Sequence, residues 1–192
     1  MEPLRTVIAE DEPLTRTIIR ARLENLGHFV VAEASDGVQA IEAVRVHHPD
    51  LVIMDIKMPV MDGIEATKRI MDETPCAVLF LSSFNEQELV DQAGDSGALA
   101  YLMKPFRKED LMPALEVAVR RFRQIQTQAK EIEQLKETLE TRKLIERAKG
   151  ILMDRHHMSE EEAFKRIHFQ ARNQNKKMRE IAQSIITAAD LI

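Results

Sequence analysis

Residues 51–63 read LVIMDIKMPVMDG, and this stretch decides the fold of the first part of the chain. The apolar run Leu51–Met54 leads into Asp55 without alternating with polar residues, which is typical of a strand buried on both faces of a sheet. A turn with Pro59 follows, and Asp62–Asp72 then has the pattern of a helix. The stretch therefore predicts a strand, a loop and a helix, the repeating unit of an α/β sheet.

The same unit recurs on both sides of this stretch. Further apolar or β-branched runs predict strands at Thr6–Ala9, Phe29–Ala32, Ala77–Leu81 and Ala100–Leu102. Helix-like stretches lie at Pro13–Leu26, Gly37–His47, Glu86–Ala93 and Lys108–Arg120. Five such repeats in about 120 residues predict a doubly wound, flavodoxin-like α/β fold with a five-stranded parallel sheet. Right-handed crossovers bring the carboxyl ends of all strands to one edge, where sites of such sheets lie.

The rest of the chain has a different composition. All seven prolines lie at or before Pro113, and Gly150 is the one glycine beyond that point, so this second part is expected to be almost purely helical. The net charge of −5 is also unevenly divided, because residues 1–140 sum to −9 and residues 141–192 to +4. This asymmetry indicates two modules with different partners, of which the basic one can approach a nucleic acid.

Two simple features bear on the compartment. Cys76 is the only cysteine, so the chain can form no intramolecular disulfide, which fits a reducing environment. The apolar runs, such as Ala77–Leu81, are too short to cross a bilayer, and the first residues lack a signal-peptide pattern. We therefore expect a cytoplasmic protein without a membrane partner.

The predicted strand ends carry a chemically coherent set of side chains. Glu10 and Asp11 follow the first strand, Asp55 ends the third, Ser82 ends the fourth, and Lys104 follows the fifth. Three carboxylates gathered in one place repel one another, and a hard divalent cation such as Mg²⁺ resolves this repulsion. Asp55 can then act as a nucleophile that forms an aspartyl phosphate, while the metal ion and Lys104 neutralise the transferring phosphoryl group.

This set, with the turn Met58-Pro59…Asp62-Gly63 and the pair Lys104-Pro105, resembles the receiver domain of two-component response regulators over about residues 3–120. The resemblance implies that a sensor histidine kinase phosphorylates Asp55. It implies metal ligation by Glu10, Asp11 and Asp55, although the family more often has Asp-Asp where this chain has Glu10-Asp11. The backbone carbonyl of Lys57, in the loop after Asp55, is expected to complete the metal shell.

Two further residues are expected to report the phosphorylation state. The resemblance implies that the Ser82 hydroxyl turns towards the phosphoryl group and that Tyr101, three residues before Lys104, is the switch aromatic. In this interpretation the Tyr101 ring moves inward when Ser82 turns and so changes a surface of the domain. The alternative is that Tyr101 is a half-buried packing residue on an edge strand.

A helix predicted from Lys108 to about Glu140 connects the two modules. Apolar residues recur with heptad spacing at Ile125, Ile132, Leu135 and Leu139. The pattern favours a parallel dimer seam that phosphorylation strengthens. The alternative is an amphipathic helix that lies on its own receiver domain.

Residues 141–192 are predicted to form three helices. The first spans about Arg142–Arg155, the second starts at Ser159 with a capping-box arrangement to Glu162, and the third follows Asn175. The buried side of the second helix is expected to hold Ala163, Phe164, Ile167 and either Phe169 or Ala171. Gly150 inside the first helix costs stability, so a partner is expected to approach closely there. The alternative is a tight crossing with another helix of the chain.

The runs ERAKGILM (residues 146–153) and SEEEAF (residues 159–164) resemble the ANTAR domain of amidase, nitrate and ethanolamine-utilisation regulators over about residues 141–190. That family binds paired short RNA hairpins in nascent leader transcripts and prevents terminator formation. By this resemblance and their basic charge, seven residues are expected to contact RNA: Lys143, Arg147, Lys149, Arg172, Lys176, Lys177 and Arg179. The sequence offers no obviously exposed aromatic for stacking on bases.

The sequence thus predicts a receiver domain at 1–120, a coiled-coil linker at 121–140 and an RNA-binding ANTAR domain at 141–192. We expect an antiterminator that dimerises on phosphorylation. A phosphorylation-dependent DNA-binding regulator is the alternative, although no helix-turn-helix pattern is visible. An aspartyl-phosphate phosphatase is disfavoured because Lys57 stands where such enzymes carry their general acid, so the chain is not expected to be an enzyme.

Overall fold

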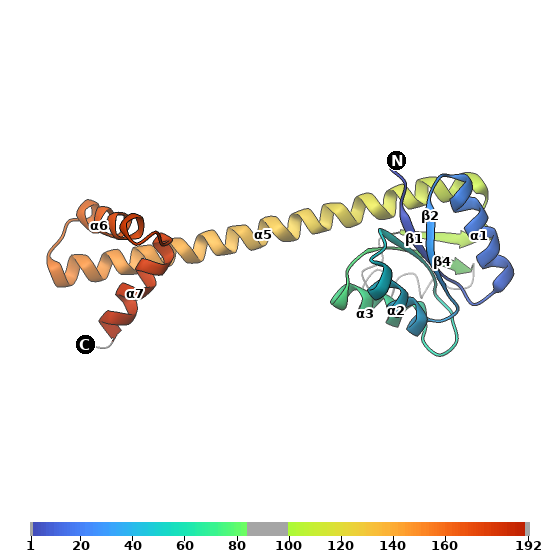
Figure 1. The fold of residues 1–192 in the computed structure, drawn as a ribbon, viewed down its shortest axis with the longest axis horizontal. Coiled ribbons are helices and arrows are strands. Elements are labelled where there is room, and N and C mark those ends of the chain that lie inside the picture. Colours follow the sequence, from blue (N-terminus) through green and yellow to red (C-terminus); the bar gives the residue numbers. More distant parts are fainter. Residues whose placement is uncertain (1, 84–99, 191–192) are drawn as a thin grey trace. The chain divides into compact units, whose positions relative to one another are not determined.

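The computed structural model describes residues 2–83 and 100–190, which form two compact units, residues 1–126 and 127–192. The first unit is built on a five-stranded parallel sheet in the order β2-β1-β3-β4-β5 (Figure 1). This confirms the doubly wound α/β fold. The predicted helix at Glu86–Ala93 lies outside the described residues. The strands of this sheet are β1 (Arg5–Ala9), β2 (Phe29–Ala34), β3 (Leu51–Asp55), β4 (Ala77–Ser83) and β5 (Ala100–Lys104).

Helices cover both faces of the sheet, as right-handed crossovers require. Helices α2 (Gly37–His47) and α3 (Gly63–Glu73) lie side by side on one face, where Val44 and Ile70 pack against Phe80 (Figure 1). Helix α1 (Pro13–Asn25) and the first turns of α5 (Lys108–His156) bury their apolar sides against the other face. Every residue of β3 is buried because this strand lies in the middle of the sheet with helices on both sides.

Aspartates fix the starts of α2 and α3. Asp36 accepts a hydrogen bond from the Gln39 amide at 2.9 Å, and Asp62 accepts one from the Glu65 amide at 2.8 Å. Both are N-caps that satisfy backbone donors in the first turn. The Asp62 cap also fixes the loop after β3, because the neighbouring Gly63 amide donates to the Ile56 carbonyl at 2.8 Å.

Helix α5 is longer than the sequence pattern predicts. The expected boundary between the linker helix and the next helix, near residues 140–142, is absent, and α5 continues without a break to His156. The physical reason is that neither proline nor glycine interrupts residues 114–149, so no helix-breaking residue lies there. Pro113 lies in the second turn of the helix, near its start.

The second unit is helical throughout its described part. The last turns of α5 pack with α6 (Glu160–Asn173) and α7 (Met178–Asp190) around a core of small and aliphatic side chains. The predicted capping box is confirmed, since Ser159 and Glu162 bond to each other's backbone amides at the start of α6. The core of this unit comprises Ala148, Leu152, Ala163, Ile167, Ala171, Ile181, Ala182 and Ile186.

The expected burial of Phe164 is wrong, whereas of the two alternatives Phe169 and Ala171 it is Ala171 that is buried. Phe164 is 45% exposed and Phe169 is 63% exposed. The buried stripe of α6 runs through Ala163, Ile167 and Ala171, which recur every four residues. Phe169 lies midway between the last two and therefore points away from the core, whereas Phe164 lies at the border of the stripe.

The heptad residues of α5 are exposed in the single chain. Ile125, Ile132, Leu135 and Leu139 are each 51–66% exposed, which is unusual for a run of large aliphatic side chains on one helix. Their partner in a dimer remains a prediction. Within residues 2–83 and 100–190, no helix is long and apolar enough to span a bilayer.

Replacing Gly150 by alanine should stabilise the second unit by about 1 kcal/mol. No heavy atom lies within 4 Å of the position that a β-carbon would occupy there, so alanine gains helix propensity without a clash. This geometry disagrees with the alternative of a tight helix crossing at Gly150, and the close approach of a partner there stays a prediction. Thermal unfolding followed by circular dichroism tests the prediction, and a lower melting temperature would contradict it.

Candidate functional site

The topology brings four of the predicted residues to one edge of the sheet. Glu10 follows β1, Asp55 ends β3, and Lys104 ends β5. The strand register aligns Asp55 with Leu81, so Ser82 lies one residue beyond Asp55 along the neighbouring strand β4. Glu10, Asp55 and Ser82 are all buried, which requires that their polar atoms find partners at this edge.

The three carboxylates form a tight cluster. One carboxylate oxygen each from Glu10, Asp11 and Asp55 lies within 4.8 Å of the others, and Asp11 is the exposed member. The ammonium of Lys104 lies 2.7 Å from Glu10 Oε2 and 3.1 Å from Asp55 Oδ1. A single lysine therefore faces three carboxylates, and the cluster keeps an excess of negative charge.

The acidity of Asp55 reflects this environment. Burial, and then the negative charge of Glu10, raise the pKa of Asp55 from 3.8 to about 6, although Lys104 opposes the shift. Glu10 and Asp55 in turn raise the pKa of Lys104 against the effect of its burial, so the ammonium stays charged. A hard divalent cation fits this oxygen-only donor set and would relieve the unfavourable charge on Asp55.

The other predicted residues of the first unit occupy different environments. The Ser82 hydroxyl is buried and donates to the Ser83 carbonyl at 3.2 Å. Tyr101 is 56% exposed, so its ring lies outside the core in this structure. Lys57 lies two residues beyond β3 with an exposed side chain, and the part of its carbonyl in metal binding stays a prediction.

Two of the seven cations predicted to contact RNA form ion pairs between helices. The side chain of Lys149 is 8% exposed, and its ammonium lies 2.9 Å from Glu146 Oε1 and 2.6 Å from Glu160 Oε1. Arg179 of α7 lies 3.6–3.7 Å from Glu137 and Glu140 of α5. The burial of Lys149 and its two carboxylate partners indicate a structural role, in which it links α6 to α5, while its expected contact with RNA stays a prediction.

Replacing Lys149 by glutamine should lower the thermal stability of the second unit. Hydrogen bonding to Lys149 holds the pKa of Glu160 below its usual 4.5. A carboxylate with a lowered pKa stabilises the fold above about pH 4.5, and this contribution disappears as the pH falls through the lowered value. The difference between wild type and variant should therefore be present at neutral pH and shrink in acid.

Hydrogen exchange of the α6 amides in the full chain measures this effect locally. Lys165→Gln is the matched control, because Lys165 pairs with Glu161 at 2.6 Å but is 72% exposed, and such surface pairs contribute little. If the α6 amides of Lys149→Gln and of the wild type are equally protected from hydrogen exchange, the structural role assigned to Lys149 is contradicted.

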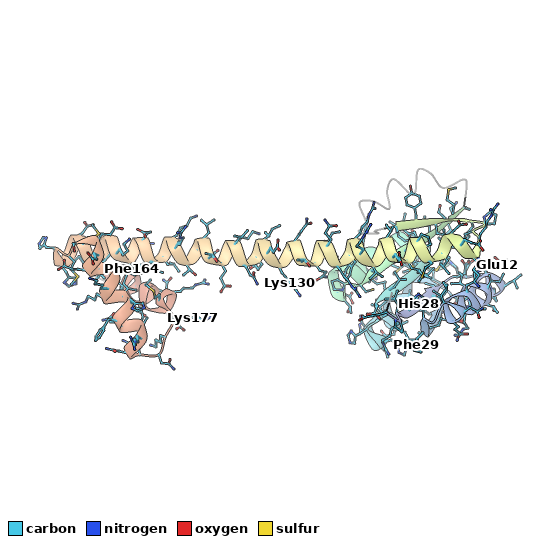
Figure 2. The ribbon with its side chains drawn as sticks, turned by 90° about the horizontal axis from the view of Figure 1, so that it is seen from above. Glu12, His28, Phe29, Lys130, Phe164 and Lys177 are labelled. Atoms are coloured by element: carbon cyan, nitrogen blue, oxygen red, sulfur yellow. The ribbon has the colours of Figure 1, made fainter. Side chains whose placement is uncertain are left out.

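The remaining predicted cations lie on the surface of the second unit. Lys143, Arg147, Arg172, Lys176 and Lys177 are all exposed. Lys176 and Lys177 lie in the loop directly before α7 rather than in its first turn (Figure 2). The sequence interpretation missed the exposed aromatic residues of α6, and the four-residue spacing of its buried stripe was the signal that could have revealed them.

Comparisons with known proteins agree with both units. Residues 6–116 match the family model of the response regulator receiver domain, and residues 133–186 match that of the ANTAR domain. The chain is 46% identical over 184 residues to the transcriptional regulatory protein PdtaR of Mycobacterium tuberculosis, covering 96% of this chain and 90% of that protein. The receiver part alone is 38% identical over 112 residues to the chemotaxis protein CheY of Bacillus subtilis, covering 58% of this chain and 93% of that protein.

Solved structures of receiver domains also align with the first unit. The signal receiver domain of the response regulator NarL from M. tuberculosis aligns with a TM-score of 0.59 and 33% identity, covering 62% of this chain and 98% of that one. A receiver domain of a Pseudomonas aeruginosa sensor histidine kinase, solved with a magnesium ion in its active-site cleft, aligns with a TM-score of 0.56 and 28% identity. It covers 61% of this chain and 98% of that chain. The acidic strand-end cluster, the helical second unit and these matches together show that the chain belongs to the response regulators that join a receiver domain to an ANTAR domain.

Proposed function

We propose that this protein is a phosphorylation-activated regulator that binds paired RNA hairpins in nascent leader transcripts and promotes antitermination. The observation that carries the proposal is the cluster of Glu10, Asp11 and Asp55 around the Lys104 ammonium, in a chain that also contains an ANTAR domain. The cluster supports a phosphoacceptor site, and the ANTAR domain supports an RNA-binding output. Such a protein acts where transcripts are made, in the cytoplasm.

In the proposed phosphoryl transfer, an Asp55 carboxylate oxygen attacks the phosphorus atom of a phosphohistidine on a sensor kinase. A phosphorus–oxygen bond forms, the phosphorus–nitrogen bond breaks, and the electron pair leaves with the imidazole. Lys104, already 3.1 Å from Asp55 Oδ1, neutralises negative charge on the phosphoryl oxygens. The reaction modifies only the protein's own Asp55, so the protein turns over no external substrate.

We propose Mg²⁺ as the cofactor, held by Glu10, Asp11 and Asp55 with the Lys57 carbonyl. When bound, it would supply positive charge that stabilises the transferring phosphoryl group. The oxygen-only donor set and its excess negative charge support this choice. The similar P. aeruginosa receiver domain was solved with magnesium in the corresponding cleft.

The affinity for Mg²⁺ should fall as the pH is lowered through about 6. The pKa of Asp55 lies near 6 in the metal-free site, and a proton on this carboxyl competes with the metal ion. We expect a loss of about tenfold per pH unit below that value. Isothermal titration with MgCl₂ at several pH values tests this, and a pH-independent affinity between about pH 5 and 7 would contradict it.

We propose that phosphorylation is transmitted through the Ser82 hydroxyl and the exposed Tyr101 ring to a dimer. The exposed aliphatic stripe of α5, formed by Ile125, Ile132, Leu135 and Leu139, supports a parallel coiled-coil seam between two copies. In this proposal residues 1–120 receive the signal, residues 121–140 form the seam and residues 141–192 bind RNA. Two ANTAR domains held together can engage two hairpins, which raises the overall affinity.

Crosslinking in cells followed by sequencing of the bound RNA identifies the transcripts, and gel shifts then measure specificity. We expect the full chain to bind the recovered leader RNA more tightly than DNA of the same sequence. The affinity should fall as salt rises, because exposed cations such as Lys143 and Lys177 replace counterions of the phosphates. Tighter binding to the DNA would favour the rival function of a DNA-binding regulator.

A further inference from the structure

Both phenylalanines of the second unit lie outside its core. The core is made of alanine, leucine and isoleucine side chains, while Phe164 is 45% exposed and Phe169 is 63% exposed on α6. Burying a phenylalanine side chain fully typically stabilises a fold by about 2 kcal/mol. Because both rings are largely exposed, neither gives its full stabilisation to this unit. An exposed pair of aromatic rings in a small soluble module indicates a binding surface.

These rings share one surface of α6 with cationic side chains. The rings of Phe164 and His168 are stacked, with centroids 6.5 Å apart and planes inclined by 16°. Lys165 and Arg172 lie beside them, and the side chains together line a shallow depression. We call this set, Phe164, Lys165, His168, Phe169 and Arg172, the aromatic face of α6. Figure 2 shows Phe164 in this unit, with Lys177 from the loop before α7.

The charges around the aromatic face favour an anionic partner. The three glutamates at the start of α6 are engaged, because Glu160 pairs with Lys149, Glu161 with Lys165, and Glu162 with the Ser159 cap. By contrast, Arg172, Lys176 and Lys177 form no ion pair with any residue in the described part of the chain. These three cations lie at the other end of α6 and in the loop that follows it.

We propose that the aromatic face of α6 binds unpaired RNA bases, which stack on Phe169 and on the Phe164–His168 pair, while Arg172, Lys176 and Lys177 contact the adjoining phosphates. Aromatic rings beside unpaired cations match the alternation of base and phosphate in a single strand. Bases within a duplex already stack on one another and hide their faces, so the partner is a hairpin loop rather than a stem. This inference rests on the proposed RNA-binding function and names the surface that performs it.

The test compares two RNA probes with the full chain. One probe is a pool of hairpins with a common stem and a randomised unpaired loop, and the other is the same stem as a blunt duplex. Wild type should prefer the loop pool. Phe169→Leu, which keeps an apolar side chain of similar size, should weaken loop binding about 5- to 100-fold and leave duplex binding unchanged. Phe169→Trp should retain loop binding.

Matched variants separate stacking from charge. Phe29→Leu is the control, because Phe29 of β2 is 61% exposed but belongs to the other unit, and its replacement should leave both affinities unchanged. Arg172→Gln should reduce the slope of log affinity against log salt by about 0.7, whereas Phe169→Leu should leave that slope unchanged.

The outcomes distinguish this inference from the proposed function. Failure of the wild type to bind either probe or the recovered leader RNA would remove the proposed function itself. Normal RNA binding with no effect of Phe169→Leu would overturn only the inference. An equal loss on both probes, or a change in the oligomeric state of Phe169→Leu measured by analytical ultracentrifugation, would also overturn it and assign the face to a protein contact.

Discussion

Asp55→Asn should abolish incorporation of a phosphoryl group from acetyl phosphate in the presence of Mg²⁺. Asparagine keeps the shape of the side chain but provides no carboxylate oxygen to attack phosphorus. Intact-protein mass spectrometry measures the modification directly. Asp72→Asn is the matched control, because Asp72 is exposed on α3 and lies outside the acidic cluster. A labelled Asp55→Asn protein, or an unlabelled control, would contradict the assignment of Asp55.

The same substitution should make the first unit more stable when no metal ion is present. The pKa of Asp55 is raised from 3.8 to about 6 in the folded state, so the unfolded chain loses this proton first and stability falls between those pH values. At neutral pH the penalty amounts to roughly 3 kcal/mol, which asparagine removes. Thermal melts in EDTA should show a higher melting temperature for Asp55→Asn at pH 7 and little difference near pH 4.

Gly63→Ala should destabilise the first unit by about 3 kcal/mol and impair phosphorylation. A β-carbon at Gly63 would lie 2.1 Å from the backbone carbonyl oxygen of Asp55 and 2.8 Å from the Met54 side chain. Displacing the backbone of a central strand costs much free energy because the strand is packed on both faces. A methyl group at Gly63 therefore forces either α3 or the phosphoacceptor to shift. The Asp62-Gly63 pair thus starts α3 directly against the residue that is proposed to react.

Urea unfolding and the rate of labelling by acetyl phosphate measure the two consequences of Gly63→Ala. Gly150→Ala serves as the control, because it makes the same change in a helix with open space around the new methyl group. Wild-type stability and labelling in Gly63→Ala would show that the contact between α3 and Asp55 does not constrain the site.

The sequence predicted the first unit well because burial and function depend there on short, local patterns. Runs such as Leu51–Asp55 are fully buried, and each of the polar residues Glu10, Asp55 and Lys104 occurs where a strand ends. Because the strands are parallel, their carboxyl ends lie at one edge of the sheet. The proximity of these side chains can therefore be predicted without knowing any side-chain contact. The ion pairs of Lys104 with Glu10 and Asp55 could not be predicted from the sequence, because their geometry depends on side-chain rotamers.

The second unit was harder to predict because helical periodicity alone does not identify which cations are free. Lys149 is basic and lies in a motif, yet its side chain is buried and its ammonium pairs with Glu146 and Glu160. Phe164 was expected in the core, and Phe169 was one of two alternatives with Ala171, but alanine, leucine and isoleucine side chains fill the core. The continuation of α5 past residue 141 was also missed. One helix was predicted to end near Glu140 and the next to start near Arg142, although no proline or glycine separates them.

The affinity of the full chain for its recovered leader RNA should be measured with and without acetyl phosphate and Mg²⁺. Phosphorylation should strengthen RNA binding by the wild type and have no effect on Asp55→Asn. The same affinity for the phosphorylated and unphosphorylated wild type, or a matching gain in Asp55→Asn, would contradict the claim that the acidic site of the receiver domain controls RNA binding by the ANTAR domain.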